Sequence, residues 1–451
     1  MPEVIKIKKG LDINLKGKAE KIFIQSDPSE TFAVKPIDFT GIFPKLTVKI
    51  DHDVKAGSPL FFNKYKPEVI FTSPVSGKVV AINRGERRRI LEVVIQADKE
   101  IRYESFIKAN PSDLSREQII ENLLESGLWP FIRQRPYHII ANPEDEPKAV
   151  FISTFDTAPL APDYDFALKN EAQPFQTGID ALSKLTSGKV HLSLNGTYPP
   201  SRVFVEARNV ELHYFRGQHP AGNVGVHIHH IDPVNKGDIV WFVNPQDVVS
   251  IGRLFEKGIY DASRIVVLSG SEIKSQRYYK TKIGASITNL VEGNVETGNL
   301  RYISGNVLTG LKIPKDGYIG FYDSQITVIP EGDYYEFLGW GLPGFKKYSV
   351  SRSFFSWLAP KKEYRIDTNL KGGRRAFVMT GEYENVFPMD IYPVQLLKAI
   401  LVEDIDLMEN LGIYEVAEED FALCEFVCTS KTDVQSIIRQ GIDLMIKELG
   451  Y

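Results

Sequence analysis

The chain has few cysteines, no surplus of basic residues and no long uncharged apolar run. Two cysteines in 451 residues cannot build a disulfide framework, which favours a reducing compartment. The 54 lysines and arginines are balanced by 58 aspartates and glutamates, which argues against nucleic acid as a partner, because such proteins need positive charge to neutralise phosphates. No window approaches the length of about eighteen apolar residues that a membrane helix needs, and the opening MPEVIKIKKG lacks the apolar core of a signal peptide. If the protein works at a membrane, we expect it to do so by docking.

A complete phosphate-binding motif is missing from the most glycine-rich turn. Gly217, Gly222 and Gly225 are separated by four and two residues, whereas a dinucleotide-binding G-x-G-x-x-G has one and two. Pro220 also removes one of the backbone amides that would point at a pyrophosphate. The turn therefore lies where an α/β protein would bind a cofactor, but it lacks the glycine spacing of a dinucleotide-binding motif.

A second glycine motif has the right spacing in the wrong surroundings. Gly339, Gly341 and Gly344 match G-x-G-x-x-G, but Pro343 lies inside it and FKKYSVSRSFF follows instead of an amphipathic helix. A lone match of this kind is weak. Neither a Walker A motif nor a G-x-S-x-G nucleophile motif occurs. We therefore expect no cofactor-binding residues in this chain and assign no catalytic residue.

Most of the histidines lie between Gly188 and Val234, a segment that includes GKVHLSLNG, RVFVEA and FRGQHPAGNVGVHIHHIDPV. The six are His191, His213, His219, His227, His229 and His230. If HIH lies on a strand, His227 and His229 face one way and could share an ion, with His213 or His191 arriving from a neighbouring strand. No cysteine or H-E-x-x-H accompanies them, so strand histidines bonded to backbone groups are the preferred interpretation and we predict no metal site.

The two cysteines lie four residues apart in EEDFALCEFVC. On a helix Cys424 and Cys428 share a face, which rules out an unstrained mutual disulfide. An iron–sulfur cluster needs four such ligands. We interpret them as two small buried apolar residues.

The first hundred residues read as short strands separated by turns. VKAGSPL followed by SPVSGKV resembles the barrel-sandwich hybrid fold of biotinyl and lipoyl carriers, so we predict that fold for 1–100. A carrier role is disfavoured because the nearest lysine, Lys66, lacks the expected Met or Asp neighbour. The arginines at 84 and 87–89 indicate a solvated hairpin turn more than an anion site.

Strands and helices alternate over 101–258, which indicates an α/β domain. KAVFIST, GKVHLSL, RVFVEA and DIVWFV are the predicted strands. A helix is predicted over 115–126, with Ser115 and Gln118 as a capping box and Gly127 as its end. Another runs from Pro245 to Gly258, and TGIDALSKLTSG is a third, ending at Gly188.

The remainder divides near residue 331. Residues 259–330 suit a small β-grasp module with a short helix beginning near Ala285. Residues 331–451 are predicted to be mainly helical, and Thr432 with Gln435 is the expected cap pair of the last helix.

An aromatic and basic stretch, Phe345 to Lys362, has two interpretations. It carries Lys346, Lys347, Arg352, Lys361 and Lys362 beside Phe354, Phe355 and Trp357. Such a surface can meet the cytoplasmic face of a membrane partner. Equally, its aromatic side chains can pack inward from a loop.

Taken together, several stretches resemble one family. They are IKIKKGLDINLKG, SPVSGKVVAINRGERR, GLWPFIRQRP, FDTAPLAPD, HPAGNVGVHIHHIDPV, GEYENVFPMDIYP and EEDFALCEFVC. In this order they are similar to the NqrA family, the A subunits of the bacterial Na+-translocating NADH:quinone reductase (Na+-NQR). The resemblance implies a peripheral subunit on the cytoplasmic face of the inner membrane, in a six-subunit complex that passes electrons from NADH to quinone and exports Na+.

The same resemblance sets the expected fold and cofactors. It implies an α/β multidomain chain with a Rossmann-like core like the flavin subunit of respiratory complex I, an SLBB-type β-grasp module and a helical C-terminal domain. FMN, FAD, riboflavin and iron–sulfur centres are expected on other subunits, chiefly an integral-membrane flavin-carrying partner, with quinone as substrate. This parentage accounts for a nucleotide turn without its glycines.

No quinone motif transfers with the resemblance. A quinone slot needs aromatic or aliphatic walls and one or two donors for the carbonyls. On chemistry alone the quinone-facing candidates are Phe215, His219, His227 and His229. The alternatives are a flavin- or NADH-binding oxidoreductase subunit of the complex I type and a ligand-binding module built on the β-grasp domain.

Overall fold

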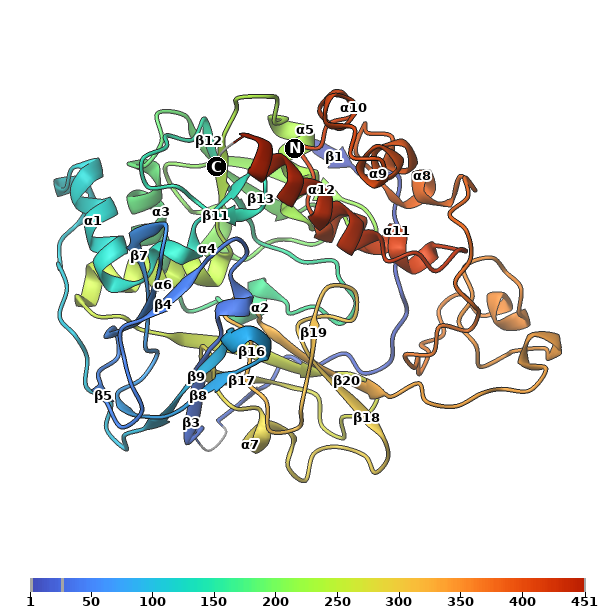
Figure 1. Cartoon of the computed structure of the whole chain (residues 1–451), viewed down its shortest axis with the longest axis horizontal. Helices are drawn as coiled ribbons and strands as arrows, with labels where there is room; N and C mark the ends of the chain where they lie inside the picture. Colours follow the sequence, from blue (N-terminus) through green and yellow to red (C-terminus); the bar gives the residue numbers. More distant parts are fainter. Residues whose placement is uncertain (1–2, 26–27, 450–451) are drawn as a thin grey trace.

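The computed structural model describes residues 3–25 and 28–449, whose strands form four sheets (Figure 1). Among these residues, no helix combines the length and the apolar character that crossing a membrane requires.

Two small antiparallel sheets form the N-terminal part. One has the order β3-β9-β8-β5 and the other β4-β6-β7. Their bounds are β3 Thr31–Val34, β4 Pro44–Leu46, β5 Asp53–Val54, β6 Pro59–Asn63, β7 Lys66–Thr72, β8 Gly77–Arg84 and β9 Ile90–Ala97. Stacked rings of Phe61 and Phe71, 4.7 Å apart, lie in their core. The arginines of the β8–β9 turn are exposed, as predicted for a solvated hairpin.

The largest sheet has the order β1-β14-β13-β12-β15-β10-β11. Its strands are β1 Val4–Lys6, β10 Arg133–Arg135, β11 Ile139–Ile140, β12 Ala149–Ser153, β13 Lys189–Asn195, β14 Glu211–Arg216 and β15 Val240–Phe242. β14, β13, β12 and β15 are mutually parallel. From β14 to β15 across the sheet, these four strands are the third, second, first and fourth in the chain. Ligands of open α/β sheets bind where such an order reverses, here between the carboxyl ends of β12 and β15.

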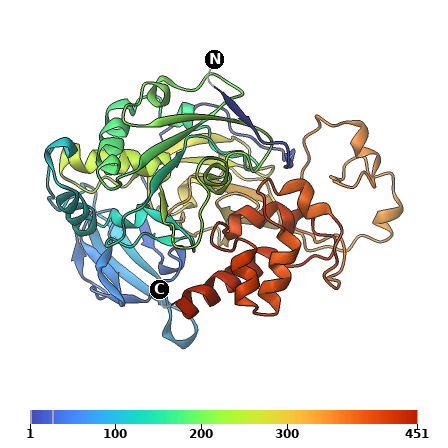
Figure 2. The same cartoon turned by 90° about the horizontal axis from the view of Figure 1, so that it is seen from above.

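Helices flank this sheet on both sides (Figure 2). The helices of this part of the chain are α1 Arg116–Ser126, which packs on β7, α2 Tyr164–Ala167, α3 Ala172–Ser183, α4 Arg202–Val205, α5 Val224–Ile231 and α6 Pro245–Lys257. The predicted capping box opens α1, and Gly127 ends it in the left-handed region at φ 72°. α6 begins at Pro245 and ends before Gly258 at φ 68°, as predicted.

Two predicted strands are helices, and one predicted helix ends early. RVFVEA forms α4, where Ser201 accepts a hydrogen bond from the amide of Val203. HIHHI lies in α5, where Val224, Ile228 and Ile231 recur in helical spacing and pack in one apolar cluster. Over so short a stretch, alternating apolar residues fit a strand and a helix equally. α3 ends at Ser183, well before Gly188.

A six-stranded sheet with the order β19-β18-β20-β16-β17-β2 forms the β-grasp part. The elements are β2 Phe23–Ile24, β16 Ser263–Ser269, β17 Arg277–Lys282, α7 Thr288–Val291, β18 Leu300–Ser304, β19 Leu311–Ile313 and β20 Gln325–Pro330. The short helix begins at Thr288 instead of near Ala285, because Ala285 and Ser286 form isolated β-bridges with Phe32 and Tyr318. β1 and β2 show that the N-terminal residues contribute strands to two sheets outside the first sandwich.

The C-terminal part has its own apolar core. Its helices are α8 Glu382–Val386, α9 Pro393–Leu401, α10 Ile405–Asn410, α11 Ala422–Val427 and α12 Val434–Leu449. The predicted cap pair of the last helix is wrong. The amide of Gln435 donates to Glu425 Oε2 at 2.9 Å, so α11 supplies the acceptor. The amide of Thr432 donates instead to Cys428 Sγ at 3.4 Å.

The segment before these helices projects from the body of the molecule (Figures 1 and 2). It contains the aromatic-basic stretch 345–362, in which the side chains of Phe345, Phe355, Trp357 and Leu358 are exposed. The outward interpretation of this stretch is therefore the one that the fold supports.

Candidate functional site

A small cavity lies at the point where the strand order reverses. Its volume is about 140 Å³. Residues following β12 and β15 line it, including Asp156 and Asn244, together with His219 and Asn223 from the glycine-rich turn and Glu419 from the C-terminal part. The cavity is comparable to one that holds a benzene-sized ring, and it is well below the 300–1,000 Å³ of an ordinary cofactor site.

The backbone amides of the glycine-rich turn are already bonded within the protein. The amide of Gly222 donates to Thr157 Oγ1 at 2.9 Å. Those of Ala221 and Asn223 donate to the carbonyls of Gln218 and Pro220, each at 2.8 Å. A phosphate site needs such amides to converge on one external anion, and these amides are not available to it.

An acidic side chain of the protein lies against the N-terminal turn of α5. A Cβ atom at Gly225 would be 2.8 Å from Asp420 Oδ2 and closer still to Oδ1. Negative charge is favourable at a helix N-terminus, the place where nucleotide-binding folds put a pyrophosphate. The Asp420 carboxylate lies against this turn beside Gly225, so the turn does not fit the phosphate of a flavin or nicotinamide.

Arg135 of β10 holds Asp420 in position. Its fully buried guanidinium donates to Asp420 Oδ2 at 3.0 Å and to Glu419 Oε1 at 3.0 Å. The amide of Ala417 adds a second donor to Asp420 Oδ2, at 2.9 Å. Burial opposes the charge of Arg135, but Asp420, Glu419 and Glu418 outweigh it and raise the pKa of the guanidinium. This buried ion pair joins the C-terminal part to the large sheet.

Two quinone-facing candidates lie inside the core. The rings of Phe215 and His227 are 4.2 Å apart in an apolar cluster with Ile7 and Phe155. His227 Nε2 donates to the carbonyl of Ala221 at 2.8 Å. Burial lowers the pKa of His227 to about 3, so the ring is neutral. Phe215 and His227 line neither the small cavity nor the larger one described below.

The other two candidates point to different surroundings. His219 lines the small cavity, with Nδ1 3.1 Å from Thr157 Oγ1, and burial lowers its pKa to about 4. His229 Nε2 accepts from the amide of Asp390 at 2.9 Å, so its Nδ1 donates to Glu415 Oε1 at 3.1 Å. His229 is thus a contact to the C-terminal part.

The shared ion considered for HIH is ruled out by the helix. Residues two apart on an α-helix point to different sides, and His227 and His229 have separate partners. Among the described residues, one trio does have the spacing of metal ligands, namely His191, Glu211 and His213.

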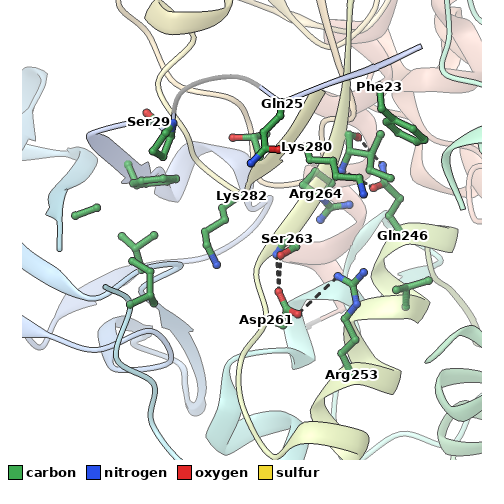
Figure 3. Close-up of a pocket in the computed structure, with 18 of the residues that line it drawn as sticks. Phe23, Gln25, Ser29, Gln246, Arg253, Asp261, Ser263, Arg264, Lys280 and Lys282 are labelled. Atoms are coloured by element: carbon green, nitrogen blue, oxygen red, sulfur yellow. Dashed lines mark hydrogen bonds and ion pairs between the residues drawn. The ribbon is translucent and has the colours of Figure 1, made fainter. Parts of the chain in front are cut away.

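A much larger cavity, about 1200 Å³, lies where the sandwich, the α/β part and the β-grasp sheet meet (Figure 3). It was not predicted from the sequence, because its walls come from segments far apart in the chain. Aromatic and aliphatic side chains line it, among them Phe23, Phe32, Ile101 and Leu168. The one local signal that could have indicated it is the alternation of Lys280 and Lys282, which places both on one face of β17.

The cationic side chains of this cavity differ in their partners. Asp261 is 2.8 Å from Lys257. It is also 3.9 Å from Arg253 (Figure 3). Lys280 and Lys282, by contrast, form no salt bridge with any carboxylate in the part of the chain that the structure describes. Burial lowers the pKa of Lys282. Two ammonium groups are thus available as donors to a ligand.

The two cysteines are buried, as predicted for small apolar residues. Cys424 lies in α11 and Cys428 directly follows it. Burial raises the pKa of the Cys424 thiol, so it is not an activated nucleophile.

Three family models match parts of the chain between residues 5 and 315. The family descriptions "NqrA N-terminal barrel-sandwich hybrid domain", "NqrA second alpha/beta domain" and "NQRA C-terminal domain" match residues 5–98, 114–260 and 265–315. These matches confirm the barrel-sandwich prediction and an SLBB-like module.

Three relatives carry one name, that of the A subunit of the Na(+)-translocating NADH-quinone reductase. The protein of Haemophilus influenzae is 40% identical over 450 residues, 99% of this chain and 100% of the relative. That of Pasteurella multocida is 39% identical over 451 residues, with the same coverage. That of Rhodopirellula baltica is 38% identical over 453 residues, 99% of this chain and 98% of its own.

Proposed function

This chain belongs to the NqrA family, the A subunits of the Na(+)-translocating NADH-quinone reductase, and from that premise we propose that it is a peripheral, cofactor-free subunit serving quinone reduction. As a family member it is one subunit of a sodium-translocating NADH-quinone reductase. In the proposed role it lies on the cytoplasmic face of the inner membrane. Its α/β core is then a Rossmann-like domain that no longer receives a nucleotide.

The position of Asp420 is the observation that carries the cofactor-free part of this proposal. A flavin phosphate at α5 would have to displace a carboxylate that two buried donors hold. It would also meet turn amides that already have acceptors. The alternative is a flavin- or NADH-binding subunit of the complex I type. It requires free turn amides and no carboxylate at the start of α5. Flavins and iron–sulfur centres then belong to other subunits of the complex.

The large cavity is the quinone site that the geometry supports best. It has the aromatic and aliphatic walls that a quinone ring needs, and Lys280 and Lys282 are donors for its carbonyls. Of the four candidates named from chemistry, only His219 lines a cavity, and that one holds at most a single ring. Phe215, His227 and His229 would then affect quinone binding only indirectly, through packing or through the contact with the C-terminal part.

The exposed stretch 345–362 is the proposed contact with an integral-membrane, flavin-carrying subunit. Phe345, Phe355 and Trp357 are exposed, and so are Lys346, Lys361 and Lys362. This composition is suited to an interface core beside a negatively charged membrane surface. In this proposal the chain docks on that subunit through this surface.

Replacing Lys282 by glutamine tests the quinone site in the whole complex. One lost charge-assisted donor costs about 1.5 kcal/mol, so the KM for a short-chain quinone is expected to rise roughly tenfold. Steady-state kinetics with NADH and quinone measure it. NADH oxidation by an artificial acceptor, which bypasses the quinone step, is expected to be unchanged.

Lys315→Gln is the matched control, because Lys315 is an exposed lysine of the same sheet region. An unchanged KM in Lys282→Gln, or an equal rise in both variants, would contradict the cavity assignment. A photoreactive quinone that labels only other subunits would contradict the quinone role of this chain as a whole.

A further inference from the structure

We propose that His191, Glu211 and His213 bind a divalent transition-metal ion of the zinc class at the exposed end of β13 and β14. Their ligand atoms lie within 4.8 Å of one another. The site is separate from both cavities.

The sheet register brings the three side chains to one face. In the parallel pair, His191 lies opposite Glu211, and Ser193 lies opposite His213. Since alternate residues of a strand share a face, His191, Glu211 and His213 project to the same side. The sequence alone favoured no metal site, because it joined these histidines to HIH and gave no sign of the glutamate. The two strands supply the whole ligand set without HIH.

The distances suit one small ion. His191 Nδ1 is 2.9 Å from His213 Nε2 and 3.7 Å from Glu211 Oε2. Tetrahedral coordination at about 2.0–2.2 Å puts ligand atoms roughly 3.4 Å apart. Small side-chain rotations therefore convert the present hydrogen-bonded pair of imidazoles into a chelating pair.

One coordination position faces solvent. β1 pairs with Tyr214–Arg216, and no strand of residues 3–25 or 28–449 pairs with the Glu211–His213 end of β14 on that side. His191 is buried, with its ring stacked on Phe151 at 4.8 Å, while Glu211 and His213 are partly exposed. Three protein ligands and an open fourth position leave room for water, as in open zinc sites.

The donor set selects the class of ion. Two imidazoles and one carboxylate favour Zn²⁺, Co²⁺, Ni²⁺ or Cu²⁺ over Mg²⁺ and Ca²⁺, which prefer oxygen. Lys189 is 2.8 Å from Glu211 Oε2, but this pair is exposed and contributes little. The second carboxylate oxygen remains available to the ion.

Titrating the chelator-treated, full-length chain with Co²⁺ tests the site. We expect one ion per chain, visible as a d–d absorption band, and competition by Zn²⁺ but not by Mg²⁺. His213→Ala and Glu211→Gln are each expected to weaken Co²⁺ binding by more than about tenfold, because each removes a ligand of the ion. Circular dichroism confirms that each variant is folded.

His52→Ala is the control, since His52 is an exposed histidine of the N-terminal sandwich. Its Co²⁺ affinity is expected to equal that of the unchanged chain. The proposal is overturned if the chain binds no stoichiometric Co²⁺. It is equally overturned if Glu211→Gln and His213→Ala, both folded, bind Co²⁺ as the unchanged chain does.

Discussion

Replacing Arg135 by methionine is expected to lower the free energy of unfolding by about 3–5 kcal/mol. The Arg135 side chain is completely buried, and so is its partner Asp420. Removing the guanidinium leaves a buried carboxylate without its counter-charge, which costs far more than the pair itself contributes. Chemical denaturation at neutral pH measures the change.

Two further variants separate this effect from general damage. Arg102→Met removes an exposed ion pair with Asp98, 2.8 Å long, and is expected to cost under about 1 kcal/mol. Adding Asp420→Asn to Arg135→Met is expected to restore part of the loss, because the fully buried carboxylate is then neutral and only the partly exposed Glu419 lacks its partner. Equal losses in Arg135→Met and Arg102→Met would contradict the buried pair.

Acidification from pH 6.5 towards pH 4 is expected to destabilise the protein through its buried histidines. Burial lowers the pKa of His219 to about 4 and that of His227 to about 3, from 6.5. In this window the two histidines bind protons in the unfolded chain but not in the folded chain, so the stability that they contribute is full above pH 6.5 and falls as pH drops. The slope is up to about 1.4 kcal/mol per pH unit for each histidine.

His227→Gln isolates one of these contributions. Glutamine can still donate to the carbonyl of Ala221 but does not titrate. Urea denaturation at several pH values between 7 and 4 is expected to show a pH slope smaller by up to about one proton than that of the unchanged chain. Identical pH slopes in the variant and the unchanged chain would contradict the conclusion that His227 is buried and neutral.

The sequence predicted those elements whose signals are local. Ser115, Gln118 and Gly127 define α1 by capping and a left-handed end, and Pro245 with Gly258 define α6 in the same way. Alternating runs with turns indicated the sandwich and the β-grasp sheet. In these cases neighbouring residues alone decide the backbone conformation.

The errors arose where partners distant in the chain decide the structure. HIHHI is helical because its apolar side packs on the large sheet, which a period of two over five residues does not reveal. Thr432 is no cap because Glu425 reaches the first turn of α12 from the preceding helix. Tertiary contacts of this kind override the secondary structure that a short sequence pattern predicts.

The sequence indicated only some of the residues of the candidate site. The spacing of Gly217, Gly222 and Gly225 excluded a nucleotide motif, but nothing local indicated that Asp420 lies against Gly225. Likewise His191 and His213 were named as possible ligands, while Glu211 emerges only from the strand register. The large cavity needs three parts of the chain and has no complete local signature.

Equilibrium dialysis of the full-length chain against FMN tests the central claim. According to this claim, the Asp420 carboxylate beside Gly225 prevents a phosphate from binding at the N-terminus of α5. We expect no FMN retained above its free concentration, and no absorbance near ~450 nm in the dialysed protein. Retention of about one FMN per chain, lost in the variant Gly225→Ala, would contradict the account.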